Sequence, residues 1–463
     1  MSGQMEAERG TRVQKIIIAN RGEIASRIIR TCHALGIETI AVYSDADRDM
    51  PYVKEAKYAF RIGEPLVQKS YLNSDLLLKI AKSEKADGIH PGYGFLSENA
   101  DFARKVRKEG LTFIGPSPET IERMGDKITA RNTMEKAGIP VIPGSREGLT
   151  TLEEACDFAE SIGYPVMLKA SGGGGGIGMV HCENQKELTK FFESTKARAK
   201  AYFGSEKIFI EKYIQNARHI EVQIFGDAYG NIVHLFERDC SVQRRHQKVI
   251  EETPSPFLSE HTRKQMYAAA LKAAEVVHYV NAGTIEFIVD EEENFYFLEM
   301  NTRLQVEHPI TEQITGLDLV KWQILVAKGE RLPLLQNEIN RSGHAMEFRL
   351  YAEDPNTFMP SPGKITGFKW KEFEGVRIDH GYLEGCFVTT FYDPMVAKCI
   401  FYSKAREDVL KTAKEFFQNI KIEGIKTNIP LFINIIDDSD FQNGTYTTKF
   451  LIEKTLQWSR GSL

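Results

Sequence analysis

The chain has 463 residues, of which 42% are hydrophobic and 27% charged, as is typical of a globular protein and not of a disordered or collagen-like chain. This length predicts about two to four domains. The formal net charge of −5 argues against a nucleic-acid binder that works by bulk positive charge.

Neither residues 1–12 nor the cysteines suggest export, and no segment suggests a membrane span. No apolar run approaches the roughly 18 residues that a membrane span needs. Residues 1–12 are polar and lack the apolar stretch of a signal peptide. The six cysteines are scattered, with no Cys-x-x-Cys pair. We therefore expect reduced thiols and a cytoplasmic protein that binds neither membrane nor nucleic acid.

The first 125 or so residues alternate strand and helix patterns, which predicts a parallel α/β sheet. The turn Asn20–Glu23 has one glycine instead of the three of a dinucleotide fingerprint, so NAD binding is not expected. The expected strands are 15–19, 39–43, 87–90 and 112–114, and the expected helices are 24–35 and 76–81.

Further along the chain the elements are less regular. The expected strands are 165–170, 207–213, 219–225, 231–237, 346–352, 387–392 and 396–401, with helices at 127–137, 259–280 and 406–419. The basic stretch Asp239–Lys248 is expected to be a loop held between ordered elements. Cys240 within it is expected to be a buried core residue, because no base can be assigned to it.

A glycine run, Gly172–Gly176 followed by Gly178, comes directly after a predicted strand. Successive glycines expose backbone N–H groups that can close over phosphate oxygens. The run is neither a P-loop nor a kinase loop, since the other motifs of those folds are missing from the chain. A flexible linker is the alternative.

Glu286 and Glu299 are expected to face each other across a hairpin. If residues 291–294 form a four-residue loop, Asp290 faces Phe295 and the count places Glu286 opposite Glu299, while Tyr296 and Leu298 pack inward. Two like charges in this arrangement repel each other, so we expect a cation to lie between the two carboxylates. With Asn301 they form an oxygen donor set that suits Mg²⁺ or Mn²⁺. Pairing of both glutamates with lysine or arginine is the alternative.

The segment Asn301–Pro309 follows directly and combines Arg303, Gln305 and Glu307. An arginine fork can bind a planar oxyanion, and a nearby glutamate can take a proton from it. A solvated loop of mixed charge is the alternative. Lys127 and Lys169 are single lysines, and a single lysine is usually a solvated surface charge. They are of interest only because of their positions in the chain, since Lys169 ends a predicted strand just before the glycine run.

Taken together, these motifs resemble those of the biotin carboxylase family, within the ATP-grasp superfamily. The resemblance spans about residues 13–452 and is carried by long strings in one order. They are Ile18–Ile24, His90–Glu98, Phe113–Pro116, Met124–Lys127, Lys169 with the glycine run, Glu211–Lys212, Arg218–Glu221, Glu237–Glu252, Glu299–Pro309, Ala352–Pro355 and Tyr392–Met395.

The resemblance implies an α/β fold in three parts. These are an N-terminal α/β domain (13–126), a central ATP-grasp domain (127–330) with a mobile glycine-rich lid (about 143–214), and a C-terminal α/β domain (344–452). It also implies ATP- and bicarbonate-dependent carboxylation of biotin N1 on a biotin carboxyl carrier protein, through carboxyphosphate. This would be the first half-reaction of an acetyl-CoA or other acyl-CoA carboxylase, with the same step in a pyruvate carboxylase as the alternative.

The resemblance also assigns roles to residues. Glu286, Glu299 and Asn301 would hold two Mg²⁺ or Mn²⁺ ions. Lys248, Arg303, Gln305 and Val306 would bind bicarbonate, Glu307 would deprotonate it, and Arg349 would stabilise the biotin enolate. The nucleotide would be bound by Lys127, Lys169, Gly174, Gly175, Gly176, Glu211, Lys212, Tyr213, Ile214, His219 and His246, with Glu211 and Lys212 framing the adenine.

One position departs from the family pattern. Ile177 stands in the lid where biotin carboxylases usually carry Arg or Lys, which removes a cation near the phosphates. We predict that Ile177→Arg changes nucleotide affinity or lid closure; unchanged ATP kinetics in that variant would refute the idea.

Two alternatives to this function make different predictions. An ATP-grasp ligase for another carboxylate would show no dependence on biotin and bicarbonate. A nucleotide-sensing protein that has lost catalysis would tolerate Glu299→Gln without loss of activity. The resemblance leaves no residues for a biotin carrier or a carboxyltransferase, so a stand-alone subunit with separate partners is expected, and a homodimer is expected from the family.

Overall fold

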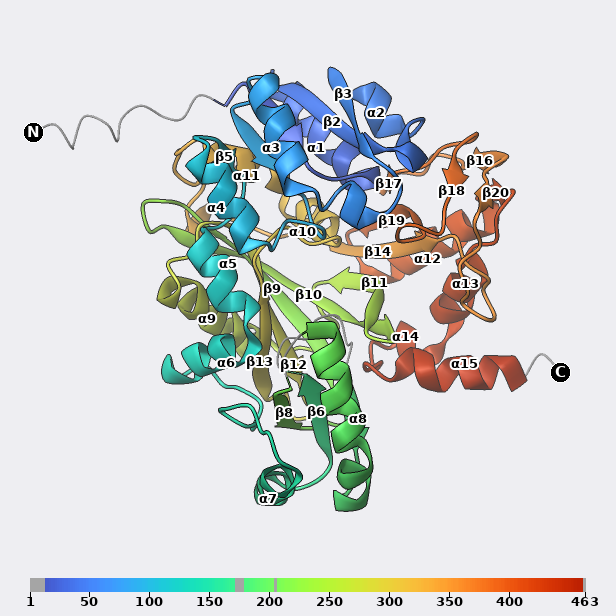
Figure 1. Ribbon diagram of the computed structural model, residues 1–463. Helices are drawn as coiled ribbons and strands as arrows, with labels where there is room; N and C mark the ends of the chain where they lie inside the picture. The colour runs from blue at the N-terminus through green and yellow to red at the C-terminus, as the bar shows by residue number, and fades with distance from the viewer. Residues whose placement is uncertain (1–12, 171–178, 204–205, 461–463) are drawn as a thin grey trace, which may run out of the picture.

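The structure, a computed structural model, describes residues 13–170, 179–203 and 206–460 (Figure 1). It is an α/β protein, as expected. The predicted glycine loop, including Gly174, Gly175, Gly176 and Ile177, lies outside the described residues.

The N-terminal part is a five-stranded sheet in the order β3-β2-β1-β4-β5, seen at the top of Figure 1. All of its strand pairs are parallel, as the alternating strand and helix pattern predicts. Ile16, Ile17 and Ile18 of β1 are fully buried, since a strand inside a parallel sheet is covered on both faces. The elements of this part are β1 (Lys15–Ile18), α1 (Gly22–Ala34), β2 (Glu38–Ser44), α2 (Pro51–Glu55), β3 (Tyr58–Gly63), α3 (Ser74–Ser83), β4 (Gly88–His90), α4 (Ala100–Lys108), β5 (Thr112–Phe113) and α5 (Pro118–Gly125).

An eight-stranded antiparallel sheet forms the middle of the molecule, in the order β13-β12-β9-β10-β11-β14-β19-β17. Its last three strands come from the C-terminal part, so the central and C-terminal parts share one sheet. The strands are β9 (Arg218–Gly226), β10 (Ile232–Arg244), β11 (Gln247–Thr253), β12 (Asn281–Val289), β13 (Phe295–Asn301), β14 (His344–Tyr351), β17 (Val376–His380) and β19 (Met395–Ser403).

Helices and short strand pairs complete these two parts. The helices are α6 (Lys127–Lys136), α9 (Glu260–Val276), α10 (His308–Thr315), α11 (Leu319–Ala327), α12 (Arg406–Asn419), α13 (Ile429–Asp437), α14 (Ser439–Gln442) and α15 (Phe450–Arg460). The short pairs are β15 (Gly363–Lys364) with β18 (Phe387–Val388), and β16 (Gly367–Lys369) with β20 (Lys421–Glu423).

A smaller module lies at the bottom of Figure 1, away from the N-terminal sheet. Its three antiparallel strands run in the order β7-β6-β8, and among the described residues its apolar core is made of residues between 149 and 210. The module falls within the predicted lid. It consists of α7 (Leu152–Ile162), β6 (Val166–Ala170), β7 (Met179–Cys182), α8 (Gln185–Phe203) and β8 (Ile208–Lys212).

Two sequence predictions about local structure were wrong. The basic stretch 239–248 is not a loop, because β10 continues to Arg244 and β11 resumes at Gln247. Only Arg245 and His246 form the turn, both with positive φ (50° and 66°), as a tight two-residue hairpin requires. The predicted strand 387–392 shrinks to Phe387–Val388, since it pairs only with the two residues of β15.

No helix within the described ranges combines the length and the apolar character that a membrane crossing would need.

Candidate active site

A large cavity of about 1100 Å³ lies between the N-terminal sheet, the central sheet and the small module. Every described residue with a predicted site role lines it. These residues are Lys127, Lys169, Glu211, Lys212, Tyr213, Ile214, His219, His246, Lys248, Glu286, Glu299, Asn301, Arg303, Gln305, Val306, Glu307 and Arg349.

A row of charged side chains crosses four strands of the central sheet. Glu221 on β9 is the ladder partner of Glu286 on β12, which is in turn the partner of Glu299 on β13. Arg238 on β10 is the partner of Glu221 on the other side, and their side chains form an ion pair of 2.5 Å. Since ladder partners project from the same face, one face of the sheet presents three carboxylates in line.

The predicted pair Glu286–Glu299 is confirmed, but the hairpin differs from the one assumed. Phe295 pairs with Val289 instead of Asp290, and an extra residue, Leu298, then restores the pair. Because such a bulge reverses the alternation of faces, Phe297 is buried with the core and Leu298 lines the cavity. The predicted inward packing of Tyr296 and Leu298 was therefore wrong.

Lys248 is the cation at the centre of the site. Its Nζ lies 2.6 Å from Glu221, 2.8 Å from Glu286 and 2.7 Å from Glu307. Burial opposes its charged form, but the surrounding groups outweigh this and raise the pKa of Lys248 well above its usual value. Lys248 thus stays charged and holds the carboxylates of two strands and a loop together.

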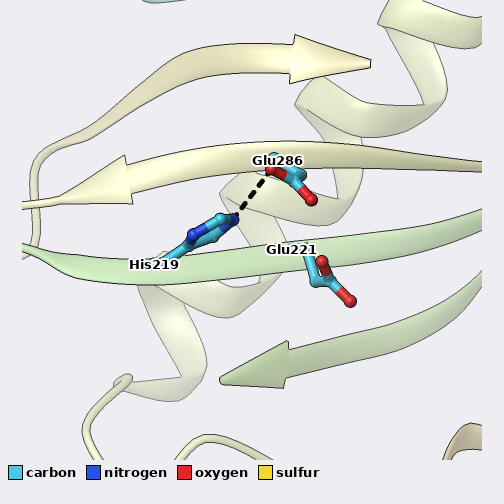
Figure 2. A group of neighbouring side chains, drawn as sticks. All are labelled: His219, Glu221 and Glu286. Atoms are coloured by element: carbon cyan, nitrogen blue, oxygen red, sulfur yellow. Dashed lines mark ion pairs between the residues drawn. The ribbon is translucent and has the colours of Figure 1, made fainter. Parts of the chain in front are cut away.

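His219 lies beside this cluster on β9, two residues before Glu221 (Figure 2). Its Nε2 is 3.0 Å from Glu286, and its Nδ1 is 2.7 Å from the side-chain nitrogen of Gln243. Burial lowers the pKa of His219, yet the negative charge of Glu286 more than compensates and raises it. Burial would likewise raise the pKa of Glu286, but Lys248 holds it well below its usual value.

Glu307 and Arg349 form the other side of the Lys248 cluster. Glu307 is fully buried at the N-terminus of α10, and Arg349 on β14 donates to it at 2.9 Å. Burial favours the neutral acid, but Lys248 and Arg349 keep the pKa of Glu307 well below its usual range. Glu307 is therefore a carboxylate that can accept a proton only if these cations move or are shared with a ligand.

Arg303 lies at the rim of the same site. Its Nε donates to Glu98 at 2.8 Å, which ties the central part to the N-terminal part, and its Nη2 donates to Oδ1 of Asn301 at 2.9 Å. The Cys240 thiol is fully buried 3.9 Å from Glu307, and burial raises its pKa well above the usual value. Cys240 is thus a protonated core thiol, as the sequence predicted.

The small module and α6 form the other end of the cavity. Lys169 on β6 forms an ion pair with Glu211 on β8. Lys212 donates to the backbone oxygens of Gly163 and Tyr164, both at 2.9 Å. Lys127 begins α6 and lies 3.6 Å from Glu299 across the cavity.

The oxygen donors of Glu286, Glu299 and Asn301 fit a hard cation such as Mg²⁺. The side-chain nitrogen of Asn301 is buried without a hydrogen-bond partner among the described residues, while Arg303 binds its oxygen. The ligand atoms of His219, Glu221 and Glu286 also lie within 4.8 Å of one another. The ammonium of Lys248 contacts both glutamates of this second group. Since Lys127 also lies 3.6 Å from Glu299, lysines pair with both Glu286 and Glu299 here, which is the alternative stated for this pair.

Several site residues could not be named from the sequence patterns used above. Glu221 could have been found, because residues 219, 221 and 223 are polar at every second position of a predicted strand. Glu98, Glu251 and Glu347 gave no such signal. Glu98 contacts Arg303 from a distant part of the chain, and Glu251 and Glu347 face each other only through the pairing of β11 with β14.

The fold and the cavity together define an ATP-grasp ligase. Family models match the biotin carboxylase N-terminal domain (residues 12–121), the carbamoyl-phosphate synthase L chain ATP-binding domain (126–335) and the biotin carboxylase C-terminal domain (347–453). The chain belongs to the biotin carboxylase family and is an ATP-dependent ligase of that family.

Individual relatives agree with this placement. "Biotin carboxylase 2" of Bacillus subtilis is 56% identical and covers 94% of this chain and 98% of its own. The crystal structure of the biotin carboxylase subunit of pyruvate carboxylase is 47% identical, covers 96% of this chain and 98% of its own, and has a TM-score of 0.82. The crystal structure of the Hydrogenobacter thermophilus 2-oxoglutarate carboxylase biotin carboxylase domain dimer, in complex with MgADP, ADP and bicarbonate, is 46% identical, covers 95% of this chain and 97% of its own, and has a TM-score of 0.92.

Proposed function

We propose that this chain carboxylates N1 of biotin on a biotin carboxyl carrier protein, as the first half-reaction of an acetyl-CoA or other acyl-CoA carboxylase. The observation that carries the proposal is the Lys248 cluster. It places a base, Glu307, between two buried cations, Lys248 and Arg349, beside the fork of Arg303. Such a site suits an anion that must lose a proton before it attacks a phosphoryl group.

In this proposal the two ends of the cavity divide the work. Lys127, Lys169, His219 and His246 bind the ATP phosphates with the lid glycines Gly174, Gly175 and Gly176, while Glu211, Lys212, Tyr213 and Ile214 surround the adenine. Glu286, Glu299 and Asn301 hold Mg²⁺ or Mn²⁺, which would neutralise the phosphate charge. The ion pair of Lys169 with Glu211 would open so that Lys169 can face a phosphate.

At the other end, Arg303, Gln305, Val306 and Lys248 bind bicarbonate. Glu307 takes its proton, since a bound anion would share the cations that now hold Glu307 charged. The deprotonated bicarbonate attacks the γ-phosphate of ATP and ADP leaves, which gives carboxyphosphate. Carboxyphosphate breaks down beside biotin into CO₂ and phosphate, and the phosphate takes the proton from biotin N1. Arg349 stabilises the resulting enolate of the ureido group, whose N1 then attacks CO₂. Closure of the lid would exclude water from an intermediate that hydrolyses readily.

We also propose the boundaries 13–126, 127–330 and 344–452 for the three parts, with the lid at about 143–214. A homodimer is proposed because a relative's biotin carboxylase domain is described as a dimer. The protein is proposed to act in the cytoplasm.

The acyl acceptor is chosen by a carboxyltransferase, so the partner tests this part of the proposal. The tagged chain would be isolated from its source cells with its carrier protein, and ¹⁴C-bicarbonate fixation measured with acetyl-CoA, propionyl-CoA, pyruvate and 2-oxoglutarate. The proposal expects transfer to an acyl-CoA. Transfer to pyruvate alone would support the pyruvate carboxylase alternative, which the similarity to the biotin carboxylase subunit of pyruvate carboxylase favours.

A further inference from the structure

Two glutamates face each other behind the Lys248 cluster, on the strands that carry Lys248 and Arg349. Glu251 on β11 and Glu347 on β14 are direct ladder partners, and each is 0% exposed. Ladder partners have Cβ atoms about 5 Å apart, and like charges so placed repel. In a dry interior that repulsion is strong, so the geometry disfavours two charged carboxylates.

The two nearby cations, Arg349 and Lys398, form ion pairs with carboxylates other than Glu347. Arg349 forms ion pairs with Glu251 and Glu307. Lys398 on β19 lies 3.0 Å from Glu23 and donates to the backbone oxygen of Val306 at 2.9 Å. Glu347 has no ion pair with either one. With both carboxyl groups unprotonated, neither the oxygens of Glu347 nor those of Glu251 have a hydrogen-bond partner in the described part of the chain, so a proton on one of the two groups would satisfy both.

The charged and titratable groups around Glu347 come from its own strand, from β11 and β19, from α1 and the start of α10, and from Tyr93. They are Glu251 of β11, Arg349 of β14, Lys398 and Cys399 of β19, Glu307 and His308 at the start of α10, and Glu23 of α1 with Tyr93, which donates to it.

These surroundings agree with a neutral acid at Glu347. Burial raises its pKa well above the usual value, and the charges of Lys398 and Arg349 do not offset this. Burial also raises the pKa of Glu251, to about 7. As pH rises, Glu347 would become charged beside a carboxylate that already faces it.

We propose that Glu347 is a positioning residue for biotin carboxylation: as a neutral acid it donates a hydrogen bond to Glu251, the carboxylate that holds Arg349 against Glu307. The inference rests on the role proposed above for Arg349 toward the biotin enolate. A neutral Glu347 keeps a third negative charge away from Arg349, so that its positive charge remains available to the substrate.

Two substitutions separate this role from simple packing. Glu347→Gln keeps a neutral N–H donor at every pH, so kcat at neutral pH is expected to stay within about twofold of the wild type. The decline of kcat at alkaline pH should move to higher pH in this variant. Glu347→Met removes the donor, and we expect a roughly tenfold lower kcat with an unchanged KM for ATP, since Arg349 is less well held.

Infrared spectroscopy tests the proton itself. The carbonyl stretch of a protonated carboxyl group should be present in the wild type at neutral pH and missing from Glu347→Gln. Glu372→Gln, at an exposed position, is the matched control and should change neither the band nor the pH profile.

The outcomes are distinct. An active wild type without the band, or a Glu347→Gln variant as impaired as Glu347→Met, would overturn this inference alone. A wild type without biotin-dependent ATP hydrolysis would overturn it together with the proposed function.

Discussion

Lys248 shows how single residues define this site, because one ammonium group contacts carboxylates from β9, β12 and the loop before α10. Removing one partner of a buried ion pair leaves the other charge uncompensated, which costs several kcal/mol. The same cation therefore stabilises the sheet and keeps Glu286 and Glu307 ionised. Stability and the chemistry of the site are coupled at this residue.

Glu252 anchors a second buried cluster, outside the cavity. It accepts from both Nε and Nη2 of Arg406 at 2.7 and 2.9 Å, and it contacts His344 and Tyr446 at 2.6 Å. Burial would raise its pKa, but Arg406 and His344 lower the pKa of Glu252 to about 2. The cluster joins β11, β14 and α12.

This cluster predicts a pH dependence of stability. Because the folded-state pKa of Glu252 is depressed, its contribution is full above the unfolded-state pKa and is lost as pH falls from about 5 towards 2. Glu252→Gln should lower the free energy of unfolding at pH 7 by about 3 kcal/mol, a difference that shrinks towards pH 2. Urea unfolding at several pH values measures this, with exposed Glu407→Gln as control. A constant difference across that range would contradict the assignment.

At the residue scale every described residue with a predicted site role lines the cavity, but the charge pattern of the site could not be predicted from the sequence. Glu286, Glu299 and Asn301 were predictable because a hairpin brings neighbours in sequence face to face. Glu251 and Glu347 were not, because their pairing depends on the order β11-β14, which joins strands about 90 residues apart. Register between distant strands is set by tertiary packing, which a local pattern does not contain.

At the scale of elements, two bulges aim the side chains of the site. Leu298 on β13 is the extra residue that keeps Glu299 opposite Glu286. On β11, Val249 is extra between the pairs Val242–Ile250 and Gln243–Lys248. A bulge changes the alternation of faces along a strand. Lys248 and Glu251, three residues apart, can therefore point to the same side, where Lys248 contacts Glu307 and Glu251 contacts Arg349. A sequence pattern that assumes strict alternation of faces predicts neither bulge.

The pairing of β9 with β12 supplies an element-scale prediction. Gly226 ends β9 opposite Asn281, and a methyl group there would overlap the backbone oxygen of Tyr279. Gly226→Ala should therefore destabilise the protein by about 2 kcal/mol or more. Gly125→Ala, where nothing lies within 4 Å of an added methyl group, is the control. Equal thermal unfolding midpoints for the two variants would contradict this prediction, because they would show that the backbone at Tyr279 shifts at little cost to accommodate the methyl group.

At the scale of the whole molecule, the parts differ in how they are joined. One apolar cluster contains residues from Val13 to Leu451, so the N-terminal, central and C-terminal parts share a core. The small module has its own core, which includes the fully buried Leu168, Phe192 and Ile210. The N-terminal, central and C-terminal parts are thus joined through a shared core. The small module, which lies within the central part, has a core separate from theirs.

This difference predicts the order of local opening. Amides of β6 and β8 should exchange with solvent at a lower opening free energy than those of β9 and β12, since the module can open without exposing the main core. Leu168→Ala should speed exchange in the module alone, because it leaves a cavity only there. Hydrogen exchange read by mass spectrometry measures both. Module and central sheet exchanging together in the variant would contradict a separate core.

The most direct test of the central claim is ATP hydrolysis by the purified protein, assayed with and without bicarbonate and biotin. We predict Mg²⁺-dependent hydrolysis that requires both, and a kcat lower by about a hundredfold in Glu307→Gln, since the base that faces Lys248 and Arg349 is lost. Hydrolysis that is indifferent to biotin and bicarbonate, or a fully active Glu307→Gln variant, would contradict that claim.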